Sequence, residues 1–118
     1  MKKLFVAAFM FVSTFTTNIF ADWHAIKMGI ILGFTGPIES LTPAMAASAE
    51  LAFKEASDSG SLLGGKNISV IRADSTCVDS AAATTAAEGV VSQGVAAIMG
   101  ADCSGVTGAI ATNVAVPN

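Results

Sequence analysis

The sequence contains few of the residues from which reactive centres are built. Its 118 residues include one histidine, two cysteines and no tyrosine. The cysteines, Cys77 and Cys103, do not form a C-x-x-C pair, and the histidine, His24, is far from both along the chain. A zinc site needs more ligands than these, and a nucleophilic serine needs a neighbouring base. We therefore expect no metal site and no catalytic activity.

Glycine-rich motifs that bind nucleotides are also missing. The segment G-A-D-C-S-G at 100–105 lacks the spacing of the dinucleotide-binding G-x-G-x-x-G motif. The segment G-S-L-L-G-G-K at 60–66 ends in a lysine that leads into a predicted strand, whereas a phosphate-binding loop places its lysine before Ser or Thr at a helix start. We expect a simple turn at 60–66 and no cofactor.

Basic residues are scarce, and the first two belong to a segment with the features of a signal peptide. Lys2 and Lys3 precede an apolar run at 4–12, and I-F-A at 19–21 ends the segment. This pattern is typical of a bacterial secretory signal that is cleaved after Ala21. An uncleaved membrane anchor is the alternative, but the apolar run is too short to span a bilayer. The predicted domains are a signal peptide, 1–21, and a mature part, 22–118.

The mature part would be acidic. Four lysines and arginines remain against nine acidic residues, which gives a net charge near −5. Such a chain is a poor partner for nucleic acid or for an anionic membrane surface. Export would place Cys77 and Cys103 in an oxidising compartment, which favours a disulfide over two buried free thiols.

The hydrophobic pattern alternates between predicted strands and helices. The predicted strands are 26–32, 67–73 and 95–99, and the predicted helices are 43–57, 80–93 and about 104–117. This β-α-β-α-β-α order predicts an α/β fold, a three-layer, Rossmann-like parallel sheet with strand order 2-1-3 and helices on both faces. The third strand would have a free edge, so the sequence looks like part of a larger sheet.

Local signals refine the predicted helices. Thr42 before Pro43 is typical of a helix N-cap, and Asp79 is a candidate N-cap for the second helix. Glu50 and Lys54 lie four residues apart and predict an ion pair on the first helix. The predicted buried stripe of that helix consists of Met45, Ala49, Ala52, Phe53 and Ala56.

Ligands of open α/β sheets bind at the carboxyl ends of the strands, which here are the loops 33–43, 74–79 and 100–105. Ser104 lies in the third loop, where a helix is expected to begin. Its hydroxyl and the neighbouring backbone amides are suited to a small carboxylate. The alternative is that Ser104 serves only as the N-cap of that helix.

Two other features belong to the same edge. Cys77 and Cys103 follow strands that are not neighbours in the order 2-1-3, so a bridge requires both loops to lean over the end of the first strand. Three carboxylates, Asp74, Asp79 and Asp102, could crowd the strand ends, but their spacing fits no calcium-binding loop.

Several short segments in order resemble a known family. They are I-K-M-G-I-I-L leading into T-G-P-I at 35–38, the turn at 60–66, the strand ending at Asp74 with Cys77 after it, V-A-A-I-M-G at 95–100 with Cys103 and Ser104 after it, and A-V-P at 115–117. Over residues 26–118 the chain resembles the N-terminal lobe of periplasmic branched-chain amino-acid binding proteins, the type I solute receptors of ABC importers.

The resemblance implies a two-lobed receptor that closes over its ligand. It implies that Ser104 holds the α-carboxylate of an amino acid and that Cys103 is bridged to Cys77. We expect Cys103, Gly105, Asp102 and Leu41 to line the same ligand site. Leu41 stands where relatives often carry an aromatic residue over the ligand side chain. Asp102 departs from the family pattern, because its charge would repel a carboxylate unless it meets the ligand's ammonium group.

The resemblance also implies a location and partners. We expect a periplasmic protein, monomeric when complete, that delivers a small solute to a membrane permease. One alternative is the ligand-sensing ectodomain of a receptor with the same lobe, and a less favoured one is a fragment of a secreted α/β enzyme.

Overall fold

Three parallel strands form one sheet in the order β2-β1-β3, as the sequence predicts. The computed structural model describes residues 25–118, so the predicted signal peptide lies outside the described residues. The strands are β1 (Ile26–Leu32), β2 (Ile68–Asp74) and β3 (Ala97–Gly100). β1 pairs with β2 along its whole length and with β3 over its last part, from Met28 opposite Ala97 to Ile31 opposite Gly100.

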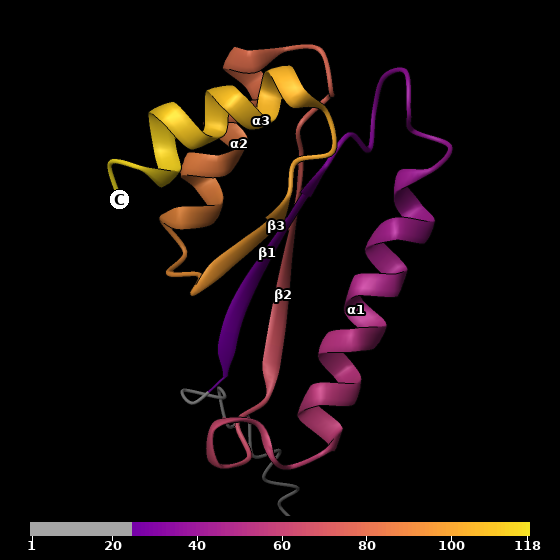
Figure 1. Ribbon diagram of the computed structural model, residues 1–118, viewed down its shortest axis with the longest axis vertical. Helices are drawn as coiled ribbons and strands as arrows, with labels where there is room; N and C mark the ends of the chain where they lie inside the picture. Colours follow the sequence, from indigo (N-terminus) through magenta and orange to yellow (C-terminus); the bar gives the residue numbers. More distant parts are fainter. Residues whose placement is uncertain (1–24) are drawn as a thin grey trace, which may run out of the picture.

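The central position of β1 follows from its composition. Ile30, Ile31 and Leu32 have at most 1% of their surface exposed. A strand with a continuous apolar run needs helices on both faces, and the structure provides them. Helix α1 (Thr42–Asp58) covers one face, and α2 (Ser80–Val91) and α3 (Ser104–Ile110) cover the other (Figure 1).

Each face of the sheet has its own apolar core. Ile30 and Leu32 pack with Ala46 of α1, together with Phe34, Ala49 and Phe53. On the other face, Ile31 packs with α2, α3 and the π-helical turn that continues α3, η2 (Ala111–Ala115). The buried residues of this second core are Ile31, Ala83, Ala87, Val90, Val106, Ile110 and Val114. Small side chains on α2 let this helix approach the sheet closely.

The start of α1 differs from the prediction. Leu41, not Thr42, occupies the N-cap position, and no side chain caps the helix. The Thr42 hydroxyl is buried and donates a 3.0 Å hydrogen bond to the carbonyl oxygen of Gly33. Thr42 therefore fastens the loop after β1 to the helix, and the N-cap prediction for it is wrong.

The buried stripe of α1 is also displaced from the predicted one. Ala46, Ala49 and Phe53 pack toward the sheet, whereas Met45 is 43% exposed and Ala52 is exposed. The spacing of the packed residues still matches one helix face. The prediction that Met45 and Ala52 are buried is wrong, because the helix is rotated so that Ala46, Ala49 and Phe53 face the sheet instead.

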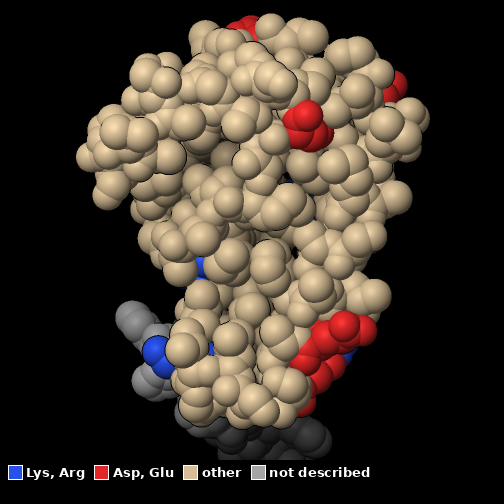
Figure 2. Space-filling view, viewed as in Figure 1, with Lys and Arg blue, Asp and Glu red and all other residues tan. Residues whose placement is uncertain are grey.

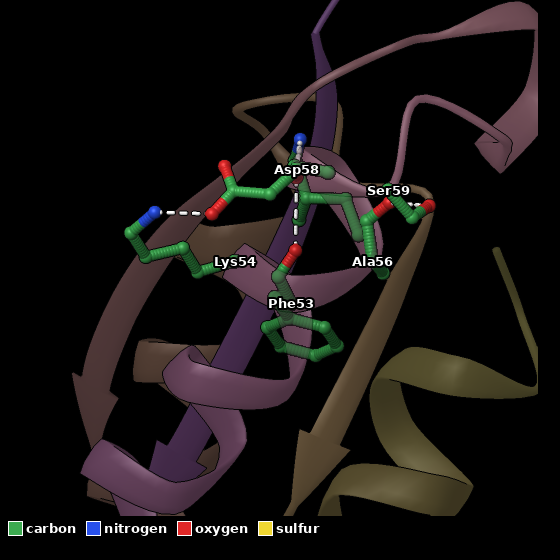
Figure 3. Close-up of polar contacts among 7 residues, drawn as sticks. Phe53, Lys54, Ala56, Asp58 and Ser59 are labelled. Atoms are coloured by element: carbon green, nitrogen blue, oxygen red, sulfur yellow. Dashed lines mark hydrogen bonds and ion pairs between the residues drawn. The ribbon is translucent and has the colours of Figure 1, made fainter.

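The predicted ion pair within α1 does not form. Lys54 pairs with Asp58 one turn later (Figure 3). Glu50 accepts two hydrogen bonds, of 2.6 and 2.7 Å, from Arg72 of β2. The planar guanidinium engages both carboxylate oxygens at once, which a lysine cannot do. Glu50 therefore joins α1 to β2.

The end of α1 is tied to the next strand. The Ser59 hydroxyl donates to the carbonyl oxygen of Ala56 at 2.7 Å (Figure 3). The Ser57 hydroxyl donates to the carbonyl oxygen of Phe53 and accepts a 2.9 Å bond from the amide of Ile68 at the start of β2. The segment 60–66 between them is a turn with one short 3-10 helix, η1 (Leu62–Gly64), as expected.

The remaining boundaries are close to the predicted ones. Asp79 is the N-cap of α2, and its carboxylate accepts bonds of 2.9 and 3.0 Å from the amides of Ala81 and Ala82, which confirms that prediction. Helix α2 ends at Val91, two residues early, and β3 is shorter than the predicted 95–99 and displaced toward Gly100. Within residues 25–118, no helix is long and apolar enough to cross a membrane.

Candidate functional site

The loops that follow the three strands meet at one end of the sheet. They are 33–41 after β1, 75–79 after β2 and 101–103 after β3, and we call this end the carboxyl edge. All three lie at the upper end of the molecule in Figure 1. The predicted site residues therefore belong to one edge, as expected for a parallel sheet with right-handed crossovers.

A disulfide joins the second and third of these loops. Cys77 and Cys103 are bridged, with their Cα atoms 5.3 Å apart. Thr76 and Cys77 have φ values of 58° and 70°, so the chain turns back at this point. A Cβ added to Gly33 would lie 3.2 Å from Cys77 Cβ, which places the bridge against the end of β1. The predicted disulfide is confirmed, and the loops do lean over the first strand.

Asp102 joins all three loops. One carboxylate oxygen accepts a 2.9 Å bond from the amide of Gly33, and the other accepts a 3.4 Å bond from the hydroxyl of Ser75. Gly33 and Ser75 are buried, so each polar group needs a partner within the protein. The sequence does not predict this cluster. Of the residues that directly follow the three strands, Gly33, Ser75 and Ala101, only Ser75 has a polar side chain.

Asp74 makes a second connection between the first two loops. Its carboxylate accepts bonds of 2.6 Å from the Thr35 hydroxyl, 3.3 Å from the Thr35 amide and 2.8 Å from the Thr76 amide. Burial raises the pKa of Asp74, but these hydrogen bonds and one from the Phe34 amide outweigh it and hold the pKa below its usual value. Asp74 therefore remains ionised and holds the first loop in place.

Ser104 is the first residue of α3, and it is exposed. The N-cap position belongs to Cys103, and no side chain caps the helix, so the alternative in which Ser104 is the N-cap is wrong. Within the described chain, the Ser104 hydroxyl makes no hydrogen bond. The first amide of α3 with a helical partner is that of Thr107, which donates to Cys103 O at 2.9 Å. The Ser104 hydroxyl is available to a ligand.

Ser104 is accessible to solvent, whereas the backbone of the turn that precedes it is fixed by hydrogen bonds. Gly105 is exposed, and no atom lies within 4 Å of a Cβ added there. The Thr107 hydroxyl lies 3.0 Å from the carbonyl oxygen of Ala101 and 2.9 Å from that of Cys103, which fixes the preceding turn. The turn thus combines a free hydroxyl with a supported backbone.

Leu41 lies on the first loop, where α1 begins. Its side chain is 61% exposed, and its amide donates a 2.9 Å bond to the carbonyl oxygen of Ile38. The nearby aromatic residue Phe34 is instead covered by Arg72, whose guanidinium carbon lies 5.6 Å from the ring centroid. Leu41 therefore offers an exposed apolar surface at the same edge of the sheet.

The carboxyl edge is acidic. Its loops contain Glu39, Asp79 and Asp102 and no lysine or arginine. Figure 2 shows separate Asp and Glu side chains in the upper part of the molecule, whereas the Lys and Arg side chains visible on this face lie lower, where a larger group of acidic side chains also lies. Among residues 25–118, no three acidic, histidine or cysteine side chains are grouped so that they could hold a metal ion.

A separate groove lies away from these loops. It has a volume of about 340 Å³ and lies beside the start of β3. Its lining comes from the end of α2, from β3 and from the C-terminal residues: Val91, Val95, Ala96, Ala97, Ile98, Ala115 and Asn118. It contains none of the predicted site residues.

Comparisons with known proteins extend this description. The family model described as "periplasmic binding protein" matches residues 25–117. The chain is also similar to a crystal structure of the branched-chain amino acid transporter substrate binding protein LivJ from Streptococcus pneumoniae str. Canada MDR_19A in complex with isoleucine. The TM-score is 0.68 and the sequence identity is 29%, over 78% of this chain and 26% of that one. The chain thus spans about a quarter of that protein. No curated protein matches it significantly.

Proposed function

The chain belongs to the periplasmic binding protein family, and we propose that the complete protein is the extracytoplasmic solute-binding component of an ABC importer that binds an aliphatic amino acid. The ligand class is supported by the similar solved protein, a branched-chain amino acid transporter substrate binding protein in complex with isoleucine. On this proposal the protein catalyses no reaction, and its partners are the amino acid and a membrane permease.

The observation that carries the proposal is the free hydroxyl of Ser104. It is exposed at the first turn of α3 and has no partner within the described chain. A hydroxyl and the adjacent amide of Gly105 can both donate to one carboxylate. We assign them to the α-carboxylate of the ligand, with Cys103 holding the turn through its bridge to Cys77.

Leu41 supports an aliphatic ligand. Its side chain is exposed at the carboxyl edge and offers an apolar contact without the flat surface of an aromatic ring. A branched aliphatic side chain buries apolar surface against such a residue. In the complete protein, a second lobe would close over the ligand from the other side.

The proposed location follows from the N-terminal segment and the family. The signal-like pattern of residues 1–21 supports export and cleavage after Ala21. We place the mature protein in the periplasm as a monomer, where it would take up solute and deliver it to the permease.

Calorimetric titration of the full-length protein tests the proposal. We expect leucine, isoleucine or valine to bind, and aspartate, lysine and simple sugars to bind far more weakly. Absence of binding for every aliphatic amino acid would overturn the proposed ligand class. Growth on the bound amino acid at low concentration, compared between a strain with the gene and a strain lacking it, tests the role in import.

A further inference from the structure

Asp102 occupies a place in the carboxyl edge that no other side chain shares. Among residues 25–118, it is the only residue of the three loops whose side chain hydrogen bonds to both of the other loops, through the Gly33 amide and the Ser75 hydroxyl. These contacts connect positions 69 and 27 residues apart in sequence. Asp102 is therefore a junction between the loops after β1, β2 and β3.

The bond to Gly33 satisfies a buried group. Gly33 follows the last residue of β1 and is buried, with the Cys77 Cβ 3.2 Å from where its own Cβ would be. The disulfide leaves little space there for another partner. A carboxylate is a strong acceptor for such an amide, and loss of the acceptor would leave a buried N–H without a hydrogen bond.

Because Asp102 is close to Ser104 in the chain, its contact with Gly33 also restricts the position of Ser104. Only Cys103 separates the two residues, and Cys103 is itself fixed by the disulfide. The two hydrogen bonds of Asp102 thus set where the turn that carries the Ser104 hydroxyl lies relative to the first loop. They also engage both carboxylate oxygens within the protein, and these neutral donors offset part of the repulsion that its charge would exert on a carboxylate bound nearby.

We propose that Asp102 is a positioning residue, which holds the Ser104 turn against the end of β1 through its hydrogen bonds to Gly33 and Ser75. This role rests on the proposed function, since the turn is positioned for the ligand's carboxylate. The competing role is a direct contact between Asp102 and the ligand's ammonium group.

Two substitutions of Asp102 separate these roles. In Asp102→Asn, the amide oxygen can still accept from Gly33, and the amide NH₂ can donate to the Ser75 hydroxyl, so the junction is kept while the charge is lost. Asp102→Ala removes both contacts. In the full-length protein we expect Asp102→Ala to weaken amino acid binding by about tenfold or more, and Asp102→Asn to recover most of that loss.

The matched control for charge is Asp79→Asn. It removes one carboxylate from the same edge, and asparagine caps a helix as well as aspartate does. We expect its affinity to stay close to that of wild type. Ser75→Ala removes only the longer of the two contacts of Asp102 and should weaken binding less than Asp102→Ala does.

Hydrogen exchange of the Gly33 amide gives a readout that does not need a ligand. We expect fast exchange at Gly33 in Asp102→Ala and slow exchange in wild type and in Asp102→Asn. If Asp102→Ala fails to fold, the comparison of Asp102→Asn with wild type still decides, because a direct ammonium contact predicts a loss of about tenfold or more for the asparagine variant.

Three results would overturn the proposal. They are a loss of affinity in Asp102→Asn as large as in Asp102→Ala, a change in preference between an amino acid and its deaminated analogue in Asp102→Asn, and slow Gly33 exchange in Asp102→Ala. If wild type binds no amino acid, the proposed function fails, while Gly33 exchange still tests whether Asp102 forms the junction.

Discussion

At the scale of single residues, Gly100 ends β3 opposite Ile31 of β1, where the two backbones leave no space for a side chain. A Cβ added there would lie 1.8 Å from the carbonyl oxygen of Ile31, and the residue has a φ of +124°. The Ile31 carbonyl and the Gly100 backbone belong to paired strands, so neither can move aside as a side chain would. We expect Gly100→Ala to lower the free energy of unfolding of the full-length protein by about 3 kcal/mol or more, measured in urea.

The control for this substitution is Gly89→Ala in α2. No heavy atom lies within 4 Å of a Cβ added to Gly89. Replacing glycine by alanine at this exposed position within a helix should raise the free energy of unfolding by about 0.5–1 kcal/mol. If Gly100→Ala were as stable as wild type, the close approach of β3 to β1 would be contradicted.

Asp74 makes the stability of the fold depend on pH. Burial raises its pKa, but hydrogen bonds from Thr35, Thr76 and Phe34 bring it below the usual value in the folded protein. In the unfolded chain an aspartate titrates at about 3.9. The stabilisation is therefore present above that pH and is lost as the pH falls through the lower, folded-state pKa.

Asp74→Asn tests this pH dependence. The variant lacks the titrating group, so its free energy of unfolding should differ most from that of wild type at neutral pH. We expect the difference to shrink as the pH falls from about 6 to about 3. A difference that is the same at both pH values would show that the hydrogen bonds of Asp74 do not favour its ionised form.

The contacts of single residues were the least predictable part of the molecule. The sequence marks Asp102 as an unusual residue, but it does not identify Gly33 and Ser75 as its partners. These residues meet only after three strands have paired in the correct order. The location of Ser104 was easier to predict, because a serine between a strand and a helix can be recognised from the local sequence.

At the scale of elements, the disulfide is the strongest link between the loops after β2 and β3. It closes a loop of 26 residues between Cys77 and Cys103. We expect the double variant Cys77→Ser, Cys103→Ser to lose about 3–4 kcal/mol of unfolding free energy in the chain-entropy account. Alkylation of the exported protein should modify neither cysteine before reduction and both after it. Two reactive thiols before reduction would contradict the bridge.

The elements themselves were largely predictable, and the exceptions have physical causes. Strand β1 and the order β2-β1-β3 follow from a continuous apolar run and alternating helices. The rotation of α1 about its axis could not be predicted from the sequence, because a helical stripe can include either Met45 or Ala46. Only packing against the sheet determines that Ala46 is the buried one. Thr42 was misassigned because its hydroxyl finds the Gly33 carbonyl, which a local pattern does not reveal.

At the scale of the whole molecule, the described chain is one three-stranded α/β unit of the periplasmic binding protein family. It spans about a quarter of the similar solved protein. Ser104, Gly105 and Leu41 belong to one edge of one sheet. On the proposed function, the remaining ligand contacts would come from a second lobe. The disulfide and the hydrogen bonds of Asp102 hold the loops of this edge together, and on the proposed function this is the surface that would bind the amino acid.

The most direct test of this account is the affinity of Ser104→Ala in the full-length protein, measured by calorimetric titration with the aliphatic amino acid that wild type binds best. Ser61→Ala serves as the control, since Ser61 lies in the turn between α1 and β2. We expect Ser104→Ala to bind at least about tenfold more weakly, a change of about 1.4 kcal/mol, and Ser61→Ala to bind as wild type does. Unchanged affinity in Ser104→Ala would contradict the role assigned to this turn.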